Sequence, residues 1–154
     1  MTNYRRLRQP GGTYFFTVCL QDRSSDLLVT HINTLRWAYA KTVAEMPVRC
    51  PAMVVLPDHL HAIWTLPEDD TDFSERWRKI KARFSHALDE NATRGASHLA
   101  KRERGIWQRR FWEHRVRDQD ELHTVIAYCR DNPVKHGHVT AAQDWPYSSF
   151  AKRT

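Results

Sequence analysis

The chain has 154 residues, a formal net charge of +6 at pH 7 and three widely spaced cysteines, Cys19, Cys50 and Cys129. A chain of this length can bury a core without disulfides or a structural metal, so we expect one domain over residues 1–154 with reduced thiols. It has no apolar run long enough for a membrane helix and no apolar export signal, which favours a soluble, cytoplasmic protein. The positive charge favours a polyanionic partner over a membrane surface.

The first half of the chain predicts a strand, a helix and two more strands. Residues 13–20 are rich in β-branched and aromatic side chains and follow a turn signal at 10–12. Residues 31–46 repeat apolar side chains at helical spacing, and Pro47 ends that pattern. Residues 52–57 and 59–67 meet at the Pro57-Asp58 turn, which predicts antiparallel neighbours in one sheet.

The second half predicts a helix, a strand and a final helix. Asp72 and Glu75 resemble a capping box, and apolar residues at helical spacing follow over 73–88. We expect a loop at 89–105 and a strand or ribbon at 105–116. A helix should begin after Asp118 and end near Asn132, because Pro133 disfavours the helical conformation of the residue before it. The order βαββαβα predicts an α+β fold, an antiparallel sheet with helices packed on it.

Most of the Lys and Arg residues lie in three segments, 1–12, 73–88 and 101–117, and tryptophans lie among them. Basic charge interleaved with aromatic rings is typical of proteins that bind single-stranded nucleic acid, because cations follow the backbone and rings stack on bases. A solvated basic surface that only keeps the chain soluble is the alternative. The candidate nucleic-acid contacts are Arg5, Arg6, Arg8, Arg76, Arg78, Lys79, Lys81, Arg83, Trp107, Arg109, Arg110, Lys135 and His136.

Two histidines flank one leucine in the segment His59-Leu60-His61. In a strand, residues two apart point to the same face, so both imidazoles project together while Leu60 points the other way. This geometry suits two ligands of one metal ion. A His-x-His pair alone is a weak signal, since buried histidines satisfied by hydrogen bonds are more common.

Tyr128 and Asn132 lie one turn apart on the flank of the last predicted helix. A hydroxyl nucleophile and an oxygen ligand would therefore emerge side by side. The structural alternative is a boundary tyrosine with its hydroxyl in water and an asparagine that ends a helix before a proline.

Four segments in this order, 59–61, 107–114, 128–137 and 144–150, together resemble the single-tyrosine HUH transposases, and most closely the REP-associated tyrosine transposases. The similarity covers nearly the whole chain, including Tyr4-Arg5-Arg6 and Gly11-Gly12-Thr13; residues 89–105 are the least family-like. The resemblance implies a ferredoxin-like HUH endonuclease fold. For REP-associated members it implies a monomer, and a dimer, as in the mobile relatives, is the alternative. We expect the protein to be associated with the nucleoid.

By this resemblance, His59 and His61 correspond to metal ligands, Tyr128 to the nucleophile and Asn132 to a third ligand of Mg²⁺ or Mn²⁺. The implied enzyme binds REP-like palindromic hairpins and cuts single-stranded DNA through a 5′-phosphotyrosine link. A phenol is mostly protonated at neutral pH, so a base or the metal must assist, and the candidates are His136 and a metal-bound hydroxide. Two alternatives remain open: a palindrome-binding protein without chemistry, and a metal nuclease that uses water in place of Tyr128.

Overall fold

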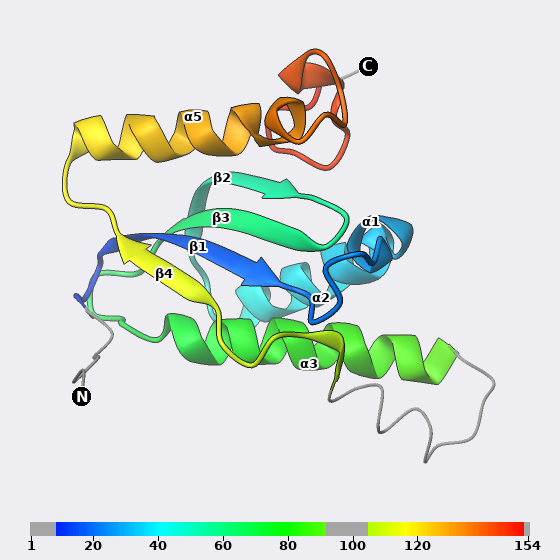
Figure 1. Ribbon diagram of the computed structural model, residues 1–154. Coiled ribbons are helices and arrows are strands. Elements are labelled where there is room, and N and C mark those ends of the chain that lie inside the picture. The colour runs from blue at the N-terminus through cyan, green and yellow to red at the C-terminus, as the bar shows by residue number, and fades with distance from the viewer. Residues whose placement is uncertain (1–8, 92–104, 153–154) are drawn as a thin grey trace, which may run out of the picture.

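The computed structural model describes residues 9–91 and 105–152, in which a four-stranded sheet lies between two helical layers (Figure 1). Helices α2 and α3 cover one face and α5 covers the other. This arrangement confirms the predicted α+β fold. The elements are β1 (Thr13–Cys19), α1 (Leu27–Thr30), α2 (Ile32–Glu45), β2 (Arg49–Val55), β3 (His59–Thr65), α3 (Phe73–Asn91), β4 (Trp112–Arg115), α5 (Gln119–Lys135) and the short 3₁₀ helix η1 (Ala142–Asp144).

The sheet has the strand order β2-β3-β1-β4, and every neighbouring pair is antiparallel. The β2–β3 hairpin turns at Pro57-Asp58, as predicted, and the Leu56 backbone N–H donates to the His59 carbonyl at 2.7 Å. Strands β1 and β3 therefore form the centre, with Thr17 opposite His61. Strand β4 is an edge.

Side-chain alternation along the central strands divides the core into two clusters, one on each face of the sheet. The larger cluster lies under α2 and α3 and includes Phe16, Leu60 and Trp64. The smaller one lies under α5 and includes Phe15 and Ile63. The face under α5 is therefore the face to which His59 and His61 belong.

Several element ends differ from the predictions, and β2 begins at Arg49, before its predicted start at residue 52. Helix α3 begins at its predicted cap, where the Asp72 carboxylate accepts from the Glu75 N–H at 3.0 Å, but it extends to Asn91. Helix α5 is capped by Asp118 as expected, yet it continues past Pro133 to Lys135. Proline removes only its own N–H donor, and the His136 N–H still donates to the Asn132 carbonyl at 3.0 Å. The strand predicted over 105–116 is confined to β4.

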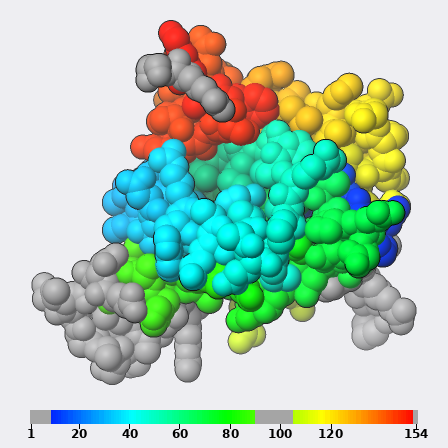
Figure 2. Space-filling view, turned by 180° about the vertical axis from the view of Figure 1, so that it is seen from behind, coloured from blue at the N-terminus to red at the C-terminus, as the bar shows by residue number. Residues whose placement is uncertain are grey.

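The C-terminal segment covers the outer edge of β2. The Val55 N–H donates to the Tyr147 carbonyl at 2.8 Å, and the Ser149 N–H donates to the Met53 carbonyl at 2.9 Å. The Met53 N–H donates to the Ser149 hydroxyl at 3.0 Å. In the space-filling view, this segment (orange to red) lies against the α1–α2 region (blue to cyan; Figure 2). Residues 147–149 thus pair with the outer edge of β2 through an isolated antiparallel bridge between Val54 and Ser148.

None of the helices formed by residues 9–91 and 105–152 combines the length and the apolar character needed to cross a membrane. The loop expected at 89–105 falls largely on residues 92–104, outside the described residues. Of the others, residues 89–91 belong to α3 and Gly105 is helical.

Candidate metal and tyrosine site

The two histidines of β3 lie side by side beneath α5. Their ring centroids are 5.0 Å apart, and both side chains are buried. Leu60, between them, belongs to the core cluster on the opposite face. The sequence-based expectation that both imidazoles share one face of a strand is confirmed.

Each histidine has its Nδ1 atom engaged by a neighbouring side chain. His59 Nδ1 lies 2.9 Å from the Asp58 carboxylate, whose other oxygen accepts from Arg23 Nε at 2.6 Å. His61 Nδ1 lies 2.9 Å from the Thr17 hydroxyl. A carboxylate can only accept, so a neutral His59 carries its proton on Nδ1 and has a free lone pair on Nε2. Asp58 and Thr17 therefore orient the two rings.

Burial keeps both rings uncharged at neutral pH. Desolvation lowers the pKa of His61 to about 3, and the nearby His59 adds to that effect. Desolvation also lowers the pKa of His59, although the Asp58 carboxylate opposes this shift. A neutral imidazole is the form that can bind a metal ion, so no proton has to be displaced for metal to bind at pH 7.

Tyr128 and Asn132 of α5, and its C-cap residue His136, follow one another at one-turn spacing and so lie on the side of the helix that faces the two histidines. The Tyr128 ring centroid lies 5.2 Å from that of His61, and the His136 centroid lies 5.6 Å from that of His59. Asn132 is placed between these two contacts along the helix. Tyr128 is 40% exposed, which leaves it accessible to a large substrate.

Three buried polar atoms at this place have no hydrogen-bond partner: His61 Nε2 and both amide atoms of Asn132. Asn132 is only 1% exposed, and buried polar groups are normally paired. A metal ion held by the two imidazoles and the amide oxygen would satisfy two of the three atoms. Within residues 9–91 and 105–152, no three His, Cys, Asp or Glu side chains are close enough together to hold a metal. The residues present fit such an ion.

A cation lies beside the tyrosine. The Lys135 ammonium nitrogen is 5.3 Å from the centroid of the Tyr128 ring. This arrangement places positive charge beside the tyrosine ring. Lys135 and His136, both sequence-predicted DNA contacts, are exposed next to the tyrosine site.

The basic residues of α3 do not form one exposed face, and Arg76 corrects the prediction most clearly. Its side chain is 1% exposed, and it donates to Asp70 and to the carbonyls of Met46, Pro47 and Asp72 at 2.8–3.2 Å. Such a guanidinium cannot reach DNA. The helical pattern placed Arg76 correctly on α3 but could not show that the α2–β2 turn covers this part of the helix.

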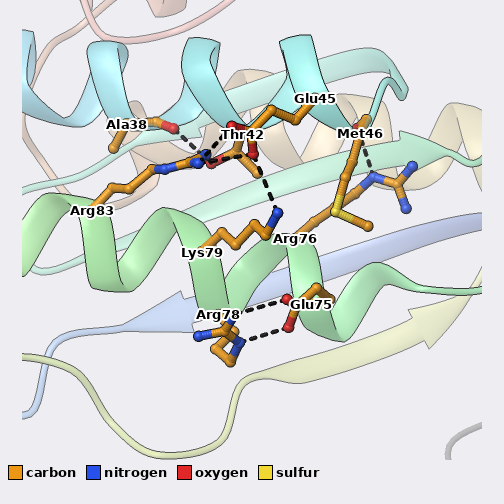
Figure 3. Close-up of polar contacts among 9 residues, drawn as sticks. All are labelled: Ala38, Thr42, Glu45, Met46, Glu75, Arg76, Arg78, Lys79 and Arg83. Carbon is orange, nitrogen blue, oxygen red and sulfur yellow. Dashed lines mark hydrogen bonds and ion pairs between the residues drawn. The ribbon is translucent and has the colours of Figure 1, made fainter.

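Lys79 and Arg83 also point from α3 toward α2, as Figure 3 shows. The Glu45 carboxylate accepts from Lys79 at 3.2 Å and from Arg83 at 2.8 Å. Arg78 lies on the other side of α3, where it pairs with Glu75. Arg76, Lys79 and Arg83 are therefore paired with groups of the protein itself. Arg78 and Lys81 lie on the other side of α3.

The 107–112 segment divides its aromatic residues between core and surface. Trp107 is 8% exposed and packs against Phe84, so it is not the free stacking ring that the sequence suggested. Trp112 is 56% exposed and is the accessible ring; its centroid lies 5.9 Å from that of Phe15. Arg109 and Arg110 are exposed as expected. The predicted contacts Arg5, Arg6 and Arg8 lie outside the described residues.

Sequence reasoning did not identify Thr17, Asp58 and Arg23 as supports of the histidine pair. Asp58 directly precedes His59 and could have been noticed for that reason. Thr17 is recognisable only from the β1–β3 register, and Arg23 only from the path of the loop after β1.

No family model matches the sequence. A REP-associated tyrosine transposase of Escherichia coli K12 is 46% identical over 150 residues, covering 97% of this chain and 83% of that protein. A Haemophilus influenzae relative that carries the same family name is 45% identical over 151 residues, covering 97% of this chain and 86% of the relative.

A solved structure of a REP-associated tyrosine transposase bound to a REP hairpin is similar to this fold, with a TM-score of 0.85 at 46% identity. The match covers 97% of this chain and 83% of that one. Sequence and fold therefore agree over nearly the whole length. The chain belongs to the family of REP-associated tyrosine transposases.

Proposed function

We propose that this transposase binds REP-type DNA hairpins and cuts an adjoining single strand through Tyr128. The hairpin is taken from the solved relative, whose structure contains one. The observation that carries the proposal is an exposed phenol placed beside a buried histidine whose Nε2 atom has no partner. A tyrosine with only a structural role would not require unpaired polar atoms, such as His61 Nε2, beside it.

The chemistry is an exchange of one phosphodiester for another. The Tyr128 oxygen attacks the phosphorus, a new P–O bond forms, and the bond to the 3′-oxygen of the neighbouring nucleotide breaks. The phenol proton passes to a base, and the leaving oxygen ends as a free 3′-hydroxyl. A 3′-hydroxyl can later attack the 5′-phosphotyrosine and rejoin the strand without a nucleotide cofactor. His136 is the candidate base, because its ring lies beside that of His59, with 5.6 Å between the centroids.

His59, His61 and Asn132 would hold the divalent cation on which tyrosine transposases of this kind depend. When bound, that ion would offset the charge that develops on the scissile phosphate. Two imidazole nitrogens and one amide oxygen suit Mn²⁺ at least as well as Mg²⁺, which prefers oxygen ligands throughout. The chain's own part is to keep both rings neutral, oriented and shielded from water.

The test is a covalent adduct. The protein is incubated with a REP-like hairpin oligonucleotide carrying a single-stranded flank, in Mn²⁺ or Mg²⁺, and the products are separated on a denaturing gel and mapped by mass spectrometry. We expect an adduct on Tyr128 that disappears in EDTA, in Tyr128→Phe and in His61→Ala. Tyr147→Phe, the same change in the C-terminal segment that covers β2, should retain it.

The other outcomes separate the alternatives. Hairpin binding without any adduct in either metal would indicate a palindrome-binding protein that does no chemistry. Cutting without an adduct, retained in Tyr128→Phe, would indicate a nuclease that uses water. An adduct that survives in Tyr128→Phe would refute the assignment of the nucleophile.

A further inference from the structure

A cavity of about 330 Å³ lies between α2, β2, α3 and the C-terminal segment. In Figure 2 the C-terminal segment (orange to red) and the α1–α2 region (blue to cyan) lie against each other at this part of the molecule. Its lining includes exposed residues, among them Arg36 and Ser149. It also includes core side chains that are at most 6% exposed: Leu35, Val55, Leu60, Trp77 and Ile80. The cavity therefore runs from the surface into the larger core cluster, and its volume is in the range of sites that hold one small molecule.

The cavity lies on the opposite face of the sheet from Tyr128. Leu60, which lines it, belongs to the core cluster under α2 and α3. The Tyr128 ring packs beside Phe15, which belongs to the cluster under α5. The sheet therefore separates a ligand in the cavity from the tyrosine site.

Among the described residues that line the cavity, Arg36 is the only charged one. Its guanidinium carbon lies 6.0 Å from the centroid of the Tyr147 ring, so it extends from α2 to the C-terminal wall. Its Nη1 atom donates to the Asn33 amide oxygen at 3.4 Å, which is a long contact, and residues 9–91 and 105–152 give it no carboxylate partner. The charge of Arg36 is therefore available to an anion at the outer part of the cavity.

The rest of the lining is mainly apolar, and two of its hydroxyls are engaged within the protein. The Tyr39 hydroxyl accepts from the Trp64 indole N–H at 2.9 Å. The Ser149 hydroxyl accepts from the Met53 N–H at 3.0 Å. A ligand that fits this lining has an apolar body, which the core side chains shield from water, and one anionic group.

We propose that this cavity binds a small monocarboxylate with an apolar body, of the size of a medium-chain fatty acid. The apolar body lies among the core side chains, and the carboxylate accepts hydrogen bonds from the Arg36 guanidinium. The planar guanidinium matches a carboxylate in both charge and geometry, and removal of the apolar body from water supplies the remaining affinity. This site goes beyond the proposed function, because it requires neither DNA nor a metal ion.

The first test compares octanoate with its neutral analogue octanamide, which has the same chain length and nearly the same shape. Both are titrated in EDTA, without DNA, and binding is followed in ¹H–¹⁵N spectra. In the wild type, octanoate should bind about fivefold more tightly, which is the contribution of one ion pair at a partly exposed position. Arg36→Met should bind octanoate only as tightly as octanamide. Lys41→Met replaces an exposed cation of α2 that does not line the cavity, and this matched control should keep the difference.

A second test uses the wild-type protein and does not depend on how a variant folds. Cys50 lines the cavity, whereas Cys19, at the end of β1, does not. Alkylation of each thiol by iodoacetamide at pH 8 is followed by peptide mass spectrometry. Octanoate at about ten times its dissociation constant should slow the reaction at Cys50 about tenfold, because about nine-tenths of the cavities are then occupied. The reaction at Cys19 should keep its rate.

The inference is overturned if octanamide binds the wild type as tightly as octanoate does, or if Arg36→Met keeps the difference between them. It is also overturned if octanoate leaves the alkylation of Cys50 unchanged or slows both thiols equally. None of these results bears on the Tyr128 adduct, so the proposed function is judged separately.

Discussion

Replacement of Asn132 by leucine should stabilise the metal-free protein while it removes a metal ligand. The Asn132 amide is 1% exposed, and neither its oxygen nor its nitrogen has a partner. Each unpaired buried polar group costs about 1–3 kcal/mol. Leucine has a similar size but a different shape, so we expect a net gain of about 2 kcal/mol in the free energy of unfolding. For a chain of this length that is about 5 °C in Tm.

Urea denaturation followed by circular dichroism, in EDTA and in Mn²⁺, measures this effect. His123→Leu is the control, because it makes a similar change in helix propensity at an exposed position of α5. In Mn²⁺ at about 100 times its dissociation constant, the wild type should gain about 2.7 kcal/mol and Asn132→Leu much less. The order of stability of the two proteins should therefore reverse between EDTA and Mn²⁺.

Two results would refute this reasoning. If Asn132→Leu were no more stable than His123→Leu in EDTA, the amide would have partners in the folded protein. If Mn²⁺ stabilised wild type and Asn132→Leu equally, the amide would not be a metal ligand.

Three further predictions follow from the described contacts. Arg76→Met should lower the free energy of unfolding by about 3 kcal/mol, because it leaves the Asp70 carboxylate and three carbonyls without their donor. Arg78→Ala should change it by less than about 0.5 kcal/mol, and equal losses in chemical denaturation would contradict the burial of Arg76. The stability of the metal-free protein should be full above pH 6.5 and fall toward pH 3, by about 2 kcal/mol at pH 5, because the unfolded chain binds a proton at His61 that the folded chain does not. A urea midpoint equal at pH 7 and pH 5, or a fall of the same size in His61→Gln, would exclude this cause. Asp58→Asn should weaken Mn²⁺ binding about 10- to 100-fold in titration calorimetry, because His59 loses the carboxylate that orients its ring. An unchanged Mn²⁺ affinity would show that Asp58 has no such role.

Periodicity was sufficient for the parts of the site that lie within one element. The two-residue repeat placed His59 and His61 on one face of β3, and the helical repeat placed Tyr128 and Asn132 one turn apart. Neither repeat could show that α5 packs on the face of the sheet that carries the two histidines. That expectation came from the family resemblance, which the relatives and the fold confirm.

The errors arose where a residue's partner is far away in the sequence. Arg76 has the spacing of a solvent-facing residue, but the carbonyls that bury it come from the turn after α2. Trp107 lies in a basic segment, yet its ring packs against α3. Helix α5 passes Pro133 because the carbonyls of its last turn still have donors. The single-domain interpretation over residues 1–154 and the monomeric state stay predictions.

The covering of β2 by residues 147–149 has a consequence for how the chain can be shortened. These residues occupy both backbone groups of Met53 and the backbone N–H of Val55, which otherwise would belong to an open sheet edge. A chain that ends before Tyr147 would expose that edge together with the apolar surface beneath it, and exposed edges of this kind recruit other strands. Loss of these few residues should therefore promote aggregation through strand pairing.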